Sequence, residues 1–171
     1  MVVDVVTGDE ADQGDRTARV ITVSTRAAAG EYEDRSGPVI ADALTEAGYA
    51  VDGPVVVPDG EPVTDALERA VADRRSVIIT TGGTGLSEDD LTPEMTRPVI
   101  EREIPQLSAA IAGYGVDHGV RTAVLSRGLA GTAGQSLIVN LPGSAGGARD
   151  GMAVLGPLLD HIVGQLHDGD H

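Results

Sequence analysis

The chain has 171 residues, no cysteine, no lysine and a formal net charge of -15. Its length suits one domain with a sizeable core, and the missing cysteines exclude a disulfide framework, a thiolate metal site and a cysteine nucleophile. The negative charge argues against general binding to nucleic acid or to anionic membranes, since both require a positive protein surface.

The first part of the chain predicts a tail, a strand and a helix. Residues 1–17 are predicted to form a flexible acidic tail, because a brief apolar start gives way to glycine and acidic residues. The aliphatic run 19–24 predicts a strand, and residues 25–36 predict a loop of small and charged residues. Apolar residues at helical spacing indicate a helix over 38–47, which Gly48 ends.

The middle part repeats this alternation. Residues 55–57 predict a second strand, and the apolar face of residues 63–72 predicts a second helix. A third strand over 76–79 leads into a loop rich in glycine and threonine, Thr81-Gly82-Gly83-Thr84-Gly85. Further on, Thr92-Pro93-Glu94 is typical of a helix start, because it offers a threonine cap, a proline in the first turn and an acid.

The last part predicts three helices and two strands, with a proline break. Helices are expected over 94–103 and 106–112 on either side of Pro105, and a closing helix over 147–166 with a kink at Gly156-Pro157. Further strands are expected over two aliphatic runs, residues 122–125 and residues 136–139. Residues 167–171 are left as a C-terminal tail.

Strands that alternate with helices predict the α/β class. We expect one three-layer α/β/α domain over residues 18–166, with a mainly parallel central sheet. Ligands of such sheets bind beyond the carboxyl ends of the strands, so functional residues are expected in the loops that follow them. A cytoplasmic location is expected, because no stretch is long and apolar enough to cross a membrane and no basic-then-apolar signal begins the chain.

The glycine-threonine loop is the first candidate site. Glycine lets the backbone approach an anion, which exposed N–H groups and threonine hydroxyls can then hold. The glycine spacing excludes the dinucleotide fingerprint, and the absence of lysine excludes a P-loop. A tight turn would also explain these glycines. The acids that follow favour function, since a divalent cation such as Mg²⁺ would relieve the repulsion among Glu88, Asp89 and Asp90. A solvated acidic turn fits these acids equally well.

Other strand ends carry polar groups too. Ser126 and Arg127 supply a hydroxyl and a guanidinium that suit a phosphate, and Asn140 supplies a donor and an acceptor. An ordinary surface arginine and plain turns fit these residues as well, and a turn residue is the simpler interpretation of Asp59. Four histidines lack a convincing metal-binding spacing and are interpreted as surface or structural residues: His118, His161, His167 and His171.

Taken together, these loops resemble the signature of the molybdopterin adenylyltransferase family, which includes Mog-type and MoaB-type bacterial proteins and the gephyrin G domain. The resemblance extends over residues 18–166 and rests on six pieces in the family's order. They are Val23–Arg26 with Gly30–Asp34, then Val57–Asp59, Thr81–Gly85 with Asp90 and Thr92–Glu94, Arg102–Pro105, Leu125–Arg127 and Asn140–Gly143.

The resemblance implies a three-layer fold that binds molybdopterin. It also implies a protein that is usually a homotrimer, with a hexamer as the alternative, and a molybdenum insertase as its partner. It implies Mg²⁺-dependent transfer of the adenylyl group of ATP to molybdopterin, with release of pyrophosphate. Asp59 and Asp90 correspond to two essential aspartates that are catalytic and hold the metal. The implied ligand-binding residues are Thr81, Gly82, Gly83, Thr84, Gly85, Ser126, Arg127, Asn140, Pro142 and Gly143.

The chain departs from the family pattern at two places. Thr25 stands where many relatives have an aspartate, and Glu88-Asp89 stand where many have a basic residue before the loop aspartate. The lost positive charge predicts weaker ATP binding or a greater need for Mg²⁺ or salt. Two alternatives follow: a non-catalytic, molybdopterin-binding MoaB-type protein, and a hydrolase of a pyrophosphate-containing nucleotide, since related domains occur in competence-damage-type proteins. The acidic surplus fits a surface that is merely kept hydrated or one that is adapted to high salt, and a GC-biased genome would in the same way favour arginine, alanine, glycine and valine.

Overall fold

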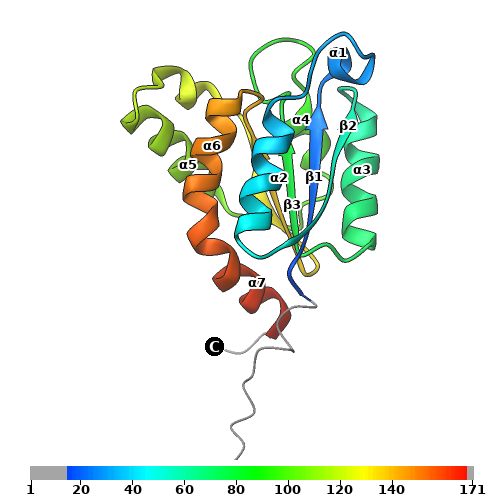
Figure 1. Ribbon diagram of the computed structural model, residues 1–171, viewed down its shortest axis with the longest axis vertical. Helices are drawn as coiled ribbons and strands as arrows, with labels where there is room; N and C mark the ends of the chain where they lie inside the picture. Colours follow the sequence, from blue (N-terminus) through cyan, green and yellow to red (C-terminus); the bar gives the residue numbers. More distant parts are fainter. Residues whose placement is uncertain (1–14, 169–171) are drawn as a thin grey trace, which may run out of the picture.

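Six strands form one sheet in the order β2-β1-β3-β6-β5-β4 in the computed structural model, which describes residues 15–168 (Figure 1). The strands are β1 (Thr17–Val23), β2 (Ala50–Val57), β3 (Val77–Thr81), β4 (Arg102–Glu103), β5 (Ala130–Ala133) and β6 (Ser136–Leu141). Strands β2, β1, β3 and β6 pair in parallel, whereas β5 pairs with β6, and β4 with β5, in antiparallel orientation. The predicted α/β class with a mainly parallel sheet is confirmed.

Helices connect these strands and cover both faces of the sheet. The α-helices are α1 (Thr25–Ala28), α2 (Ser36–Glu46), α3 (Glu61–Ala72), α4 (Thr92–Thr96), α5 (Pro105–Asp117), α6 (Ala145–Leu155) and α7 (Leu159–Asp168). Two short 3-10 helices, η1 (Arg121–Leu125) and η2 (Gly156–Leu158), complete the set. Among residues 15–168, no helix combines the length and the apolar character that a membrane crossing requires.

The side chains of β3 show how the three layers arise. Successive residues of a strand point to opposite faces, and all five residues of β3 are buried. Val77 and Ile79 belong to the larger core cluster, with residues of α2, α5, α6 and α7. Ile78 belongs to the second cluster, with Val63 and Leu67 of α3. A strand buried on both faces reads as a continuous aliphatic run, which is why this one could be found in the sequence.

Two predicted elements are wrong. The strand predicted over 122–125 is the 3-10 helix η1, with Val124 63% exposed, and no strand of the described part of the chain pairs with it. The real strand, β5, begins at Ala130 and was missed because its sequence of alanine, glycine and threonine carries no aliphatic signal. The helix predicted over 94–103 ends at Thr96, since Pro98 cannot continue it, and the chain then forms β4.

Other boundaries shift without changing the topology. The strand predicted over 55–57 is the end of an eight-residue strand that starts at Ala50. Thr17 already belongs to β1, and α7 continues through His167 to Asp168. His167 has a structural contact, since its Nε2 lies 3.2 Å from the Oγ of the buried Ser76 just before β3. Asp15 and Arg16 of the predicted tail are also described, and Arg16 forms an ion pair with Asp160 of α7 at 3.2 Å. Residues 1–14 and 169–171 lie outside the described residues.

Candidate functional site

The glycine-threonine loop lies where the parallel strands end. In Figure 1 the arrowheads of β1 and β3 point toward the edge where this loop and α1 lie. The N–H of Gly82 donates to the carbonyl of Leu141 at the end of β6, 3.0 Å away. On its other side, a Cβ on Gly82 would stand 2.3 Å from the carbonyl oxygen of Val23, at the end of β1. Close packing between two strand ends therefore requires glycine here, at a φ of 101°.

All four carbonyl groups of residues 82–85 are held by two anchoring residues. The hydroxyl and the N–H of Thr92 donate to the carbonyls of Gly82 and Gly83, at 2.8 and 3.0 Å. The N–H and the Nε of Arg127 donate to the carbonyls of Thr84 and Gly85, at 2.9 and 2.8 Å. These four hydrogen bonds hold the loop in place through its carbonyl groups.

The amide groups of the same loop remain available. Within residues 15–168, no acceptor receives a hydrogen bond from the N–H groups of Gly83, Thr84 or Gly85. Consecutive N–H groups without internal acceptors form the concave arrangement that binds anions such as phosphate. These N–H groups thus have no acceptor among the described residues, as an anion site requires, and anion binding by this loop stays a prediction.

The two aspartates flank this loop. Oδ2 of Asp59 accepts hydrogen bonds from the N–H and the hydroxyl of Thr25, at 3.2 and 2.8 Å, and its Oδ1 lies 3.0 Å from the position of a Cβ on Gly83. Oδ2 of Asp90 accepts from the N–H of Ser87 at 3.1 Å and lies 2.7 Å from a Cβ position on Gly85. Residues 31 positions apart in the sequence thus border one glycine loop.

The donor set at the loop suits a metal ion that arrives with a phosphate. Within residues 15–168, no three acidic, histidine or cysteine side chains are grouped to bind a metal. Mg²⁺ commonly uses one or two carboxylates and takes its other oxygens from phosphate and water. Asp59 and Asp90 each keep one carboxylate oxygen without a hydrogen bond in the described part of the chain. They therefore fit this mode of binding.

Thr25 has a positive role in this arrangement. Its hydroxyl donates to the Asp59 carboxylate and accepts from the Asp59 N–H, at 2.8 and 3.1 Å. A carboxylate in place of this hydroxyl would repel Asp59 instead of orienting it. Thr25, which stands where the family pattern has an aspartate, therefore orients Asp59 through a hydrogen bond.

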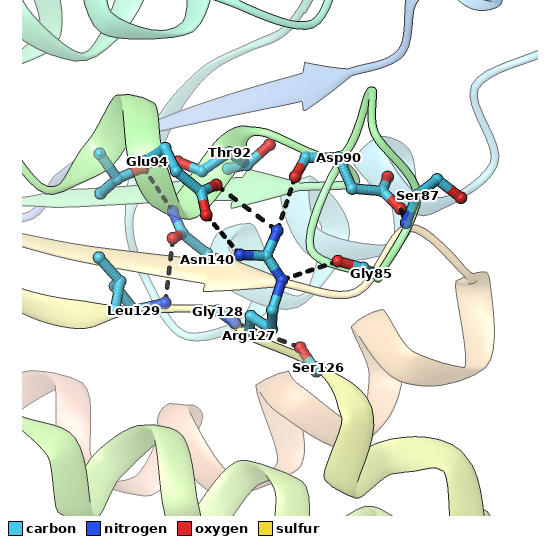
Figure 2. A network of polar contacts seen from close by, with 11 residues as sticks. Gly85, Ser87, Asp90, Thr92, Glu94, Ser126, Arg127, Gly128, Leu129 and Asn140 are labelled. Atoms are coloured by element: carbon cyan, nitrogen blue, oxygen red, sulfur yellow. Dashed lines mark hydrogen bonds and ion pairs between the residues drawn. The ribbon is translucent and has the colours of Figure 1, made fainter.

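Arg127 connects the loop to α4 (Figure 2). Its NH1 contacts Oε1 of Glu94, and its NH2 donates to the carbonyl of Asp90 at 2.6 Å. The hydrogen bond from Arg127 lowers the pKa of Glu94, and the same contact raises the pKa of Arg127. Since most of its donors are engaged within the protein, the direct role of this side chain is to position residues 85–90.

We expect a small pH-dependent contribution of this ion pair to stability. Because the folded protein lowers the pKa of Glu94, the contribution is present above the ordinary value of 4.5 and is lost as the pH falls through the lowered pKa. Glu94→Gln should therefore lower the Tm by no more than about 3 °C at pH 7, since both side chains are partly exposed, and the difference should vanish in acid. Thermal melts from pH 7 to pH 3 measure this.

The matched control for the ion pair is Glu68→Gln, which removes the same charge from an exposed position of α3. It should show no loss of Tm specific to neutral pH. A Glu94→Gln difference that stays constant over the whole pH range would contradict the role of the ion pair.

A cavity of about 580 Å³ opens beside the loop. One wall is a face of α5, formed by Ser108, Ile111, Ala112 and Gly115 at helical spacing. Residues of η1 and the first two turns of α6 form the rest of the enclosure. The cavity is therefore polar at the loop and largely apolar or small-sided at the helices, which is typical of a site for a small molecule or cofactor.

The structure brings most of the predicted site residues to this cavity. The residues that line it are Gly83, Thr84, Gly85, Asp90, Ser126, Asn140, Pro142 and Gly143. Those that do not line it are Asp59, Thr81, Gly82 and Arg127. Asp59 borders the loop from the side of β2, and the other three hold the loop or the neighbouring strand end in place.

Two of these residues use their polar groups inside the protein. The hydroxyl of Thr81 donates to the carbonyl of Pro142 at 2.7 Å and is fully buried. Asn140 donates to the hydroxyls of Thr80 and Thr96, at 2.9 and 3.0 Å, and accepts from the N–H of Leu129 at 3.0 Å. Asn140 therefore shapes the wall of the cavity (Figure 2) rather than presenting free groups to a ligand.

The helical walls were missed in the sequence. The face of α5 carries small and apolar residues every three to four positions, a pattern that also describes an ordinary core helix. Only Gly115 sets this face apart from an ordinary core helix, because a Cβ at this residue would come within 2.7 Å of the Cβ of Ala123. That close approach between α5 and η1 depends on tertiary packing.

Comparisons with known proteins agree with this geometry. Residues 19–161 match the family described as a probable molybdopterin binding domain. The chain is similar to the Mog protein of molybdopterin biosynthesis from Mycobacterium ulcerans, with 49% identity and a TM-score of 0.84 over 88% of this chain and 99% of that one. It is 36% identical to a molybdopterin adenylyltransferase from Pyrococcus furiosus over 148 residues, which are 84% of this chain and 87% of the relative.

Some relatives are much longer. The molybdenum cofactor synthesis protein cinnamon from Drosophila melanogaster is 38% identical over 89% of this chain, but the chain spans only 26% of its length. The chain likewise spans about half the length of two bifunctional proteins of molybdenum cofactor biosynthesis. In these relatives, the matching region is one part of a larger protein.

Proposed function

We propose that this chain, which belongs to the family of the probable molybdopterin binding domain, is a molybdopterin adenylyltransferase. The family and its named relatives support a role in molybdenum cofactor biosynthesis. The observation that carries the more specific proposal is the glycine loop, which is bordered by Asp59 and Asp90. Its carbonyls are hydrogen-bonded, and within residues 15–168 its amides from Gly83 to Gly85 have no acceptor.

The proposal assigns one substrate to each side of the loop. Molybdopterin would occupy the cavity, with its ring between α5 and α6 and its phosphate at the amides of Gly83 to Gly85. The triphosphate of ATP would cross the loop toward Asp59. The two phosphate groups that must react would then meet over the loop, which supplies hydrogen-bond donors to both.

The reaction transfers an adenylyl group. An oxygen of the terminal phosphate of molybdopterin attacks the α-phosphorus of ATP, and the bond from this phosphorus to the oxygen that bridges to the β-phosphate breaks. Adenylylated molybdopterin and pyrophosphate are the products. Because little covalent chemistry falls to the protein, positioning and the neutralisation of charge provide most of the catalysis.

Asp59 and Asp90 would hold Mg²⁺ together with phosphate oxygens of ATP. Bound Mg²⁺ supplies the positive charge that neutralises the triphosphate and the departing pyrophosphate. Thr25 and Ser87 orient the two carboxylates through the hydrogen bonds to each Oδ2. Arg127 keeps Asp90 beside the loop by binding its carbonyl.

A second candidate is a non-catalytic molybdopterin-binding protein. It is favoured by the charges beside the loop, where Glu88 and Asp89 are exposed and most donors of Arg127 are engaged within the protein. Acids near the triphosphate would weaken ATP binding unless Mg²⁺ or salt compensates. Such a protein would bind molybdopterin through the same cavity without turnover.

The assay that separates these candidates uses the purified protein with molybdopterin, ATP and Mg²⁺. We expect adenylylated molybdopterin and pyrophosphate in equal amounts, and neither product without Mg²⁺. Molybdopterin binding without either product would favour the non-catalytic candidate. Cleavage of a pyrophosphate-containing nucleotide in the absence of molybdopterin would instead indicate the hydrolase.

The family resemblance extends the proposal beyond the single chain. Under it, the protein acts in the cytoplasm as a homotrimer or a hexamer and transfers its product to a molybdenum insertase. Sedimentation of the purified protein would measure the oligomer.

A further inference from the structure

One acidic side chain lies in the cavity away from the glycine loop. Among the described residues that line the cavity, only Asp90 and Asp150 are charged. Asp90 belongs to the loop, whereas Asp150 lies in the second turn of α6. The helical part of the cavity therefore contains a single carboxylate, surrounded mainly by glycine, alanine and aliphatic residues.

The neighbouring residues of α6 do not explain why an aspartate stands at position 150. Its helical neighbours three and four positions away are Gly146, Gly147, Ala153 and Val154, none of which can pair with a carboxylate. Within residues 15–168, no hydrogen bond or ion pair reaches its side chain. Aspartate is also an unfavourable residue in the interior of a helix. A half-buried carboxylate of this kind accepts hydrogen bonds from whatever occupies the cavity, so it is available to a ligand that carries donors.

The position of the carboxylate suits a flat ring. Its Oδ2 lies 3.9 Å from the place that a Cβ on Gly115 of α5 would take, so it stands at the gap between the two helices. The residues nearest this gap are small, and Gly146 has no heavy atom within 4 Å of its Cβ position. Asp150 lies six positions after the helix cap Ser144, a rise of about 9 Å, which leaves room for fused rings between a phosphate at the loop and this carboxylate.

We infer that Asp150 recognises the 2-amino-4-oxopyrimidine ring of the pterin, by accepting hydrogen bonds from its exocyclic amino group and the adjacent ring N–H. These two donors point in the same direction from one edge of the ring, as the donors of a guanidinium do, and a carboxylate can accept both. The inference rests on the proposed function, because it specifies how the proposed substrate is held.

Two pairs of measurements test this role. The fluorescence of bound pterin should show that Asp150→Asn and Asp150→Ala weaken molybdopterin binding about 10- to 100-fold while the affinity for ATP stays unchanged. The wild-type protein should also prefer 6-hydroxymethylpterin to 6-hydroxymethyllumazine, which carries an oxygen in place of the 2-amino group. Both variants should lose this preference, because only the carboxylate distinguishes the two rings.

The matched control is Asp117→Asn, which removes the same charge from an exposed position of α5 and should leave both measurements unchanged. Equal molybdopterin binding by the wild-type protein and Asp150→Asn would overturn the role of Asp150, even if adenylyl transfer were observed. A wild-type protein without the preference for pterin over lumazine would overturn it as well. A wild-type protein that binds molybdopterin with an Asp150-dependent preference but makes no product would leave this inference standing and contradict only the proposed enzyme.

Discussion

Asp59→Asn and Asp90→Asn are each expected to lower the kcat of adenylyl transfer about 100- to 1,000-fold, while molybdopterin binding stays close to that of the wild-type protein. Each substitution keeps the size of the side chain and removes the negative charge that would hold Mg²⁺ at the triphosphate. Both carboxylates keep an oxygen without a hydrogen bond in the described structure, so this oxygen is the group that the substitution changes.

The measurement is the rate of pyrophosphate release under saturating molybdopterin, combined with a binding titration. Asp89→Asn is the matched control, because it removes a charge from the same loop at an exposed residue for which no contact is seen within residues 15–168. It should retain turnover, and lower repulsion should make it bind ATP at least as well. Unchanged turnover in both Asp59→Asn and Asp90→Asn would refute the adenylyltransferase proposal.

Gly82→Ala is expected to destabilise the protein by about 3–5 kcal/mol. Gly82 has a φ of 101°, which an alanine adopts only with strain. The added Cβ would also stand 2.3 Å from the carbonyl oxygen of Val23, which is backbone and can move only if β1 moves. Urea denaturation of the purified variant measures the loss in the free energy of unfolding.

Gly60→Ala separates the two causes. Gly60 has a similar φ of 96°, but no heavy atom lies within 4 Å of its Cβ position. This control should therefore show the strain alone, about 1–3 kcal/mol. If Gly82→Ala cost no more than Gly60→Ala, the close approach of the loop to β1 would not contribute to stability.

Prediction from the sequence succeeded where the pattern was local. The strand at residues 76–79 is an aliphatic run buried on both faces, and the helix at 63–72 has a continuous apolar stripe, so both were found within a few residues of their observed bounds. Prediction failed at residues 122–125, whose aliphatic composition is typical of a strand. These residues lie at the rim of the cavity, where no neighbouring strand can pair with them, and they form η1.

The candidate site divides in the same way. The glycine loop and Asp90 could be found because they are adjacent in the chain. The role of Arg127 could not, because the sequence shows a guanidinium after an aliphatic run but not the four acceptors on the loop and α4 that it binds. The interpretation of Arg127 as a phosphate ligand therefore remains a prediction, and a direct contact would require its ion pair with Glu94 to open.

The class of the fold, the glycine loop and the acidic residues that follow it could be read from the sequence alone, because aliphatic runs, helix caps and glycine spacing act through near neighbours. Three features became visible in the folded structure: Asp59 and Asp90 border one loop, α5 and α6 enclose a cavity, and Asp150 in its wall has no partner among residues 15–168. These features depend on the strand order β2-β1-β3-β6 and on helix packing. Strand order and packing are set by contacts between residues far apart in the chain, which no local pattern encodes.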